Sequence, residues 1–179
     1  EEYYKMLRSG SAEKTVRALV ATGLVEPISR DLHRGAGEPL WRSLAVVDAY
    51  RARFASAPET FTNAVLLGSL LVPLGLVPQA GRHGGRADRP EDDGAEGDGE
   101  APADRRSTPA FKLGELPLAR RDVERLRLIL SLQRRLLDLG ASPRAQRALT
   151  HRSIFRDALT WLEVHGRAPD VVEHWITVL

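Results

Sequence analysis

The segment from 80 to 106, AGRHGGRADRPEDDGAEGDGEAPADRR, is the feature that most constrains how this chain can fold. Apart from its two prolines it has no apolar side chain larger than Ala, and it holds six glycines and thirteen charged residues. Such a segment cannot bury enough apolar surface to offset the entropy lost on ordering. We therefore expect a disordered acidic insertion or linker over 80–110, which joins two small helical units at 1–79 and 111–179.

The apolar composition favours helices over strands. Leu and Ala together number 48, whereas Val and Ile together number 17. Unbranched side chains lose little rotamer freedom in a helix, so this balance predicts an all-α fold. The chain also has no cysteine, which excludes disulfides, Cys-ligated zinc, iron–sulfur clusters and a thiol nucleophile.

Three main helices are expected before the acidic segment. The first follows Ser11 and ends at Gly23, and the second runs from about Glu38 to about Phe54. The sequence Ser56-Ala57-Pro58-Glu59 reads as a capping box for the third, which should end at Pro73. A short helical turn is also expected near the N-terminus, at Tyr3–Leu7.

The strongest helical pattern, Leu118–Leu139, lies after the acidic segment, between Pro117 and Gly140. The nine large apolar side chains from Val123 to Leu139 cover an arc of roughly 220°, which predicts a largely buried helix. Shorter helices are expected over 144–150, over 153–166 and from Pro169 onward.

A narrow polar stripe remains on the helix over Leu118–Leu139. Arg120, Arg127 and Arg134 follow one another at seven-residue intervals, which places them about 10.5 Å apart along one face. The stripe also holds Glu124, Ser131 and Arg135. Two further basic groups follow along the chain. Arg144, Arg147 and His151 have the helical spacing i, i+3, i+7, and Arg152 and Arg156 have the spacing i, i+4.

A row of arginines has two interpretations. A guanidinium donates paired hydrogen bonds in one plane and suits phosphate oxygens, so the row can follow an RNA or DNA backbone. Alternatively the row is a solvated helix face with ion pairs, such as Glu124 with Arg120 or Arg127.

No residues of a recognisable catalytic or metal site are found. The sequence has no P-loop, no Gly-x-Ser-x-Gly and no His-Glu-x-x-His, and its five histidines lack ligand spacing. Gly68 and Ser69 lie in an apolar helix with no Asp-x-Asp after them, so we interpret them as a packing feature. No catalytic residue and no metal ligand are therefore assigned.

The sequence predicts a cytoplasmic chain with no membrane partner. No charged-then-apolar leader with a small-residue cleavage site is found. The most apolar stretch, Ala64–Val77, has 14 residues and contains Pro73 and Gly75, so it is too short and too broken to cross a bilayer.

Two regions of the chain resemble bacterial poly(A) polymerases. EEYYKMLRSGSAEKTVRALVATGLVEPIS resembles the segment that follows the catalytic head in that family. LPLARRDVERLRLILSLQRRL, with HRSIFRDALTWLEVHG and VEHWITVL, resembles the family's C-terminal RNA-binding region, including its Pro-x-x-Arg, Gln-x-Arg and Phe-Arg-x-Ala elements. Where better-known members have more helix between these regions, this chain has the acidic segment.

The resemblance implies the neck, body and RNA-binding part of a polymerase that adds AMP from ATP to RNA 3′ ends. In that family Mg²⁺ and ATP bind to an N-terminal head with a Gly-Ser motif followed by Asp-x-Asp. This sequence has no such combination, so we expect no catalysis by this chain alone. The implied partner is the RNA 3′ end. The implied RNA contacts are Arg120, Arg121, Arg127, Arg134, Arg135, Arg144, Arg147, Arg152 and Arg156.

Two other functions stay open at this point. One is a helical protein-interaction adaptor whose arginines meet acidic partner surfaces. The other is the tail of a tRNA CCA-adding nucleotidyltransferase, because the residues that select ATP or CTP belong to the head. The sequence also leaves open the oligomeric state and whether the two helical units pack together.

Overall fold

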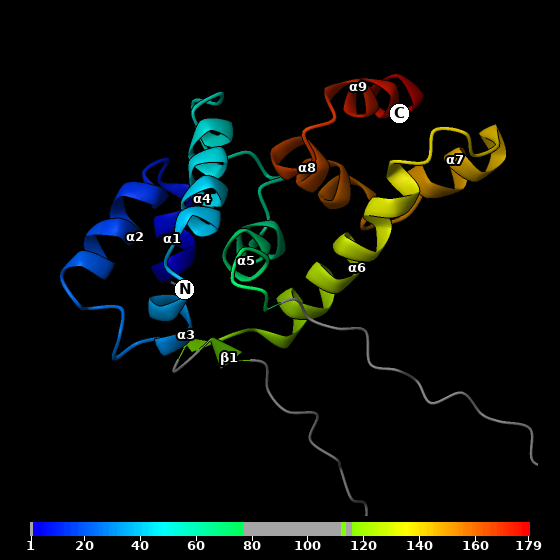
Figure 1. Ribbon diagram of the computed structural model, residues 1–179. Helices are drawn as coiled ribbons and strands as arrows, with labels where there is room; N and C mark the ends of the chain where they lie inside the picture. Colours follow the sequence, from blue (N-terminus) through cyan, green and yellow to red (C-terminus); the bar gives the residue numbers. More distant parts are fainter. Residues whose placement is uncertain (1, 77–111, 114–115) are drawn as a thin grey trace, which may run out of the picture.

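A computed structural model describes residues 2–76, 112–113 and 116–179, and its described part consists of nine helices and one antiparallel hairpin (Figure 1). This confirms the expected all-α fold. The expected disorder of 80–110 concerns residues outside the described ranges, and the division of the chain at that segment stays a prediction.

The first part of the chain contains α1 (Glu2–Arg8), α2 (Ala12–Ala21), α3 (Arg30–Arg34), α4 (Glu38–Arg51) and α5 (Asn63–Leu71). The second part contains β1 (Lys112–Leu113), β2 (Leu116–Pro117), α6 (Arg120–Leu136), α7 (Pro143–Thr150), α8 (Phe155–His165) and α9 (Pro169–Val178). In the hairpin Lys112 pairs with Pro117 and Leu113 with Leu116. The sequence predicted neither this hairpin nor α3.

The predicted start of the third helix is wrong. Helix α5 begins at Asn63, and the residues around the expected capping box form a turn in which the Phe61 amide donates to the Pro58 carbonyl at 2.9 Å. The reason is the burial of Phe61, whose ring is 1% exposed and packs 5.4 Å from the ring of Tyr50. The chain turns at this point to put Phe61 against α4.

Helix α5 occupies the centre of the molecule, between α4 on one side and α6 and α8 on the other (Figure 1). Every residue from Ala64 to Leu71 is buried. The helix has nine residues, and no helix in the described ranges is long and apolar enough to span a membrane. Its apolar character therefore serves packing on all sides.

The two parts of the chain share one hydrophobic core. Val65 and Leu66 of α5 belong to the same cluster as Leu126 of α6 and Trp161 of α8. This answers the question that the sequence left open, because helices from both parts pack against each other. A second cluster joins α6 to α9, where the Trp175 indole nitrogen donates to the Leu136 carbonyl at 2.8 Å.

Helix α6 is less buried than its sequence predicts. Leu126 and Ile129 are fully buried, but Leu128 is 56% exposed and Leu137 is 51% exposed. The physical reason is that α6 packs against α5 and α8 along one side only, so the apolar arc is wider than the surface available to cover it. The predicted largely buried helix is thus an amphipathic one.

Gly68 is the packing feature expected from the sequence. A Cβ atom at this position would lie 2.5 Å from Cζ3 of Trp161 and 2.7 Å from Cδ1 of Leu126. Both distances are too short for non-bonded carbons, so a glycine is required where α5 approaches α6 and α8.

His165, at the end of α8, is placed by Ser69 and Trp161. Its Nε2 lies 2.9 Å from the Ser69 hydroxyl, which donates to the Val65 carbonyl at 3.0 Å and so accepts from the imidazole. The His165 ring packs against the Trp161 ring, with centroids 4.2 Å apart and ring planes tilted by 39°. Burial lowers the pKa of His165 to about 4, so the ring is neutral at pH 7.

Replacing Gly68 with Ala tests the close approach of the three helices. Ala is favoured over Gly within a helix by about 1 kcal/mol, so a tolerant site would gain stability. We expect a loss of about 2 kcal/mol in the free energy of unfolding, because the added methyl group overpacks the core. Urea unfolding followed by circular dichroism measures this. The control is Gly37→Ala, in which the nearest atoms lie 3.9 Å from the new Cβ. We expect no comparable loss in its free energy of unfolding.

The low pKa of His165 predicts a loss of stability in mild acid. The unfolded chain binds a proton below the ordinary pKa of about 6.5, whereas the folded chain binds it only near 4, so protons favour unfolding between these values. The full difference is about 3 kcal/mol. The measurement is urea unfolding of the parent and of His165→Gln from pH 7 to pH 4.5. Carboxylates titrate in both proteins, so the difference between the two pH profiles is the contribution of His165. Identical pH profiles for the two proteins would contradict a lowered pKa of His165.

Candidate nucleic-acid interface

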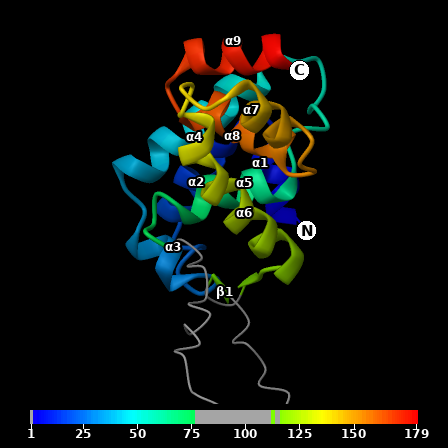
Figure 2. The ribbon, with the colours of Figure 1, turned by 90° about the vertical axis from the view of Figure 1, so that its right-hand side faces the viewer.

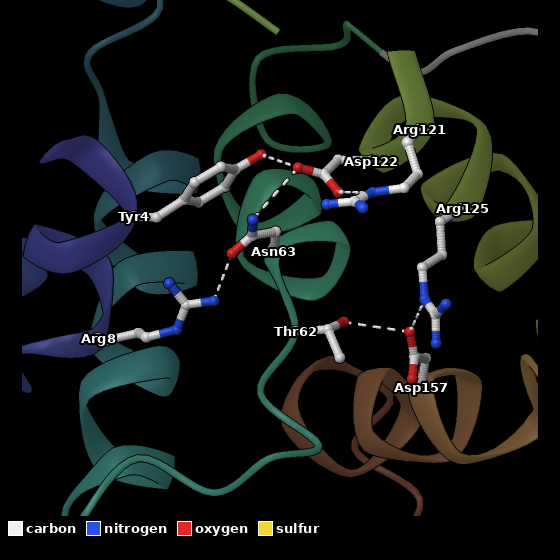
Figure 3. A network of polar contacts seen from close by, with 8 residues as sticks. All are labelled: Tyr4, Arg8, Thr62, Asn63, Arg121, Asp122, Arg125 and Asp157. Carbon is white, nitrogen blue, oxygen red and sulfur yellow. Dashed lines mark hydrogen bonds and ion pairs between the residues drawn. The ribbon is translucent and has the colours of Figure 1, made fainter. Parts of the chain in front are cut away.

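Two buried carboxylates fix the rotation of α6 about its axis. Asp122 of α6 is 5% exposed, and its Oδ2 accepts hydrogen bonds from the Tyr4 hydroxyl at 3.0 Å and from the Asn63 amide at 3.3 Å (Figure 3). Asn63 in turn accepts a hydrogen bond from Arg8. Burial raises the pKa of Tyr4, which keeps its hydroxyl a donor. Helices α1, α5 and α6 are thereby tied together.

The second carboxylate, Asp157 of α8, is 4% exposed and pairs with Arg125 of α6 at 2.5 Å. Its Oδ2 also accepts from the Thr62 hydroxyl at 3.1 Å, just before α5 (Figure 3). The hydrogen bond to Asp157 raises the pKa of Arg125. Arg125 therefore belongs to the framework, and it is not among the predicted RNA contacts.

The same two carboxylates turn the predicted stripe to the solvent. Arg120 lies about 160° around α6 from Asp122, since each residue advances the helix by about 100°. Arg120 and Arg134 are exposed, as the stripe requires. Arg127, between them, is half-buried, and its Nη1 lies 2.9 Å from Oε1 of Glu124. The stripe is thus one face of α6, but its middle member is held by an ion pair within the helix.

The ion pair of Arg127 with Glu124 is one that the solvated-face interpretation predicts. A further predicted contact, Arg121, is 86% exposed and lies 3.8 Å from Oδ1 of Asp122. The N-terminal half of α6 therefore has carboxylates beside three of its four arginines, Arg121, Arg125 and Arg127. Its positive charge is partly balanced within the molecule.

The remaining predicted contacts have a different environment. Residues 131–156 contain six arginines and a single carboxylate, Asp138. All six are exposed, and in the described part of the chain none of them forms a salt bridge. We call them the basic cluster: Arg134, Arg135, Arg144, Arg147, Arg152 and Arg156.

Helices α6 and α7 bring part of the basic cluster together. They lie on the side of the molecule that faces the viewer in Figure 2. Arg135 near the end of α6 and Arg152 after α7 line one hollow of about 260 Å³. Arg144 and Arg147 lie about 60° apart around α7. The structure thus brings Arg135 and Arg152, which the sequence presents in separate groups, to one hollow.

The motifs that carry the family resemblance are mainly structural. Gln133, of the Gln-x-Arg element, donates to the Ala158 carbonyl at 3.0 Å and so joins α6 to α8. In the Phe-Arg-x-Ala element, Phe155 and Ala158 are core residues, whereas Arg156 is exposed. Of that element, only Arg156 is available to a ligand.

The sequence interpretation missed the buried carboxylates and Asp138. A signal existed for Asp122, because it falls inside the apolar arc, between Leu126 and Ile129 in a projection down the helix axis. A carboxylate on the buried face must find hydrogen-bond donors, which predicts a polar contact at that point. Asp138 follows Arg135 by three residues, a spacing that places both on one helix face, but no pattern in the sequence indicates that Arg152 lies near them.

Among the described residues there is no group of three or more His, Asp or Glu side chains that could hold a metal ion. Comparison of the chain with protein-family models, with characterised proteins and with solved structures gave no match. The case for a function therefore comes from the surface itself and from the resemblance stated above.

Replacing Arg125 with Gln separates framework arginines from surface ones. We expect a loss of about 2 kcal/mol in the free energy of unfolding, because among the described residues the buried Asp157 carboxylate then keeps only Thr62 as a side-chain partner. The matched control is Arg121→Gln, which removes a charge from the same helix and should leave the urea midpoint unchanged. Equal midpoints for the two variants would show that Asp157 does not depend on Arg125.

Proposed function

We propose that this chain is the RNA-binding helical portion of a poly(A) polymerase, an enzyme that adds AMP from ATP to RNA 3′ ends. The observation that carries the proposal is the basic cluster, in which six exposed arginines are accompanied by one carboxylate. In this proposal Mg²⁺ and ATP bind to a head that the sequence does not contain, and the setting is the cytoplasm.

The chemistry of the basic cluster supports RNA as the partner. Guanidinium groups bind phosphate oxygens in a fork geometry and release the counterions that surround a nucleic acid. Arg134, Arg144 and Arg147 have no carboxylate partner in the described structure that would compete with phosphate. The family resemblance favours RNA over DNA. A CCA-adding tail would use the same surface and stays an alternative.

The exposed leucines support a second candidate, the protein-interaction adaptor. Leu128 and Leu137 are both more than half exposed on the same helix as Arg134 and Arg135. An acidic partner helix with apolar residues could cover these side chains together. The two functions predict different losses when arginines are removed, so one experiment separates them.

A triple variant tests the RNA proposal. We expect Arg134→Gln, Arg144→Gln and Arg147→Gln together to weaken binding to unrelated single-stranded RNAs about equally, because phosphate contacts carry no sequence information. The slope of log K against log salt should fall by about 0.7 per contact, or about 2 in total. Fluorescence anisotropy with labelled RNAs of about 15 nucleotides across a salt titration measures both quantities.

The matched control removes the same charge elsewhere. Arg30, Arg34 and Arg42 are exposed on α3 and α4, and their replacement by Gln should change the slope far less. If the basic-cluster variant bound RNA as tightly as its parent at every salt concentration, the cluster would be a solvated surface. The adaptor function would then be the better conclusion.

A further inference from the structure

We propose that the hollow between the end of α6 and α7 holds one unstacked nucleobase that carries an exocyclic amine, and that it gives RNA binding a base preference. This inference rests on the RNA binding proposed above. It goes further, because a surface made only of phosphate contacts would not distinguish one sequence from another.

The hollow has an apolar floor and a charged rim. Its volume is about 260 Å³, somewhat below the roughly 300–1,000 Å³ of pockets for drug-sized ligands, so it suits a single base. The residues that line it are Arg135, Asp138, Ala141, Ala145, Ala148, Leu149 and Arg152. The three alanines leave space that any larger side chain on this side of α7 would fill.

The walls of the hollow are held in place before any ligand binds. The Gln146 amide nitrogen donates to the carbonyls of Leu139 and Ala141, each at 3.1 Å, and so fixes the turn between α6 and α7. The other end of that amide, Oε1, lies 3.2 Å from Nε2 of His174 on α9. The Ser142 hydroxyl accepts from the Ala145 amide at 3.3 Å. A preformed hollow binds without first having to order its walls.

The lining favours a base over a phosphate. A phosphate group in the hollow would lie on alanine methyl groups and beside the Asp138 carboxylate, which repels it. A base has two flat faces that pack on apolar side chains and stack on guanidinium planes such as those of Arg135 and Arg152. Phosphates on either side of that base can then meet the rest of the basic cluster.

Asp138 determines which bases fit. A carboxylate accepts hydrogen bonds and donates none, and in the described structure Asp138 has no ion-pair partner. The exocyclic amines of adenine, cytosine and guanine supply donors to such a group. Uracil presents carbonyl oxygens on either side of its single N–H, which the carboxylate repels. The hollow therefore favours RNA that contains adenine or cytosine over RNA made of uracil.

The test compares three RNAs of about 12 nucleotides, all adenine, all cytosine and all uracil, by anisotropy with the full chain at one salt concentration. We expect the first two to bind about fivefold tighter than the third, the effect of one added hydrogen bond. Asp138→Asn should bring the ratio close to one, because an amide can serve uracil as well. The ratio is the readout, since the loss of a negative charge strengthens binding of all three RNAs.

A second variant fills the hollow. Ala145→Leu places a larger side chain on the floor at an exposed position, so the core is untouched, and it should also abolish the preference. Its matched control is Ala18→Leu, at an exposed position of α2, which should keep the ratio of the parent.

The outcomes separate the two proposals. A parent with no preference, or a preference that survives in both Asp138→Asn and Ala145→Leu, overturns the base site while RNA binding through the arginines stands. The base site is also overturned if only the basic-cluster variant loses RNA affinity and both hollow variants keep the parent's ratio of affinities for the three RNAs. No RNA binding by the parent overturns both proposals.

Discussion

The contact of Gly68 with Trp161 and Leu126 is the constraint on which the rest of the structure depends. Helix α5 is buried over nearly its whole length, and a glycine lets α6 and α8 approach it more closely than any side chain would allow. Because α5 belongs to the first part of the chain and the other two helices to the second, this contact joins the parts into one core. It sets how closely α6 and α8 pack against α5.

Polar contacts fix the rotation of α6 about its axis, which the apolar core leaves free. Apolar packing is not directional, so it alone would allow α6 to rotate against α5. The Asp122 and Asp157 carboxylates remove that freedom, because each must keep its hydrogen-bond donors or lose the solvation it had in water. One side of α6 is thus committed to the framework, and the opposite side is presented to solvent as a rigid surface. Rigid elements position a binding surface more accurately than loops do.

The arginines of the chain divide into two kinds by their neighbours. Arg125 and Arg127 are paired with carboxylates, so their positive charge serves the structure. The basic cluster has exposed guanidinium groups with Asp138 as the single carboxylate among them, and that imbalance is what a phosphate backbone requires. In the base site proposed above, Asp138 makes the hollow unfavourable for a phosphate and able to select a base.

The sequence by itself determined the all-α fold, the approximate helices and the exposed positions of Arg120 and Arg134, because helical periodicity is a local property that needs no partner. It also identified Gly68 as a packing residue. It could not determine that α6 leaves Leu128 exposed, that Phe61 replaces the expected capping box with a turn, or that Arg135 and Arg152 line one hollow. Those features depend on which helix lies beside which, and contacts between residues far apart in the chain are decided only when the tertiary structure forms.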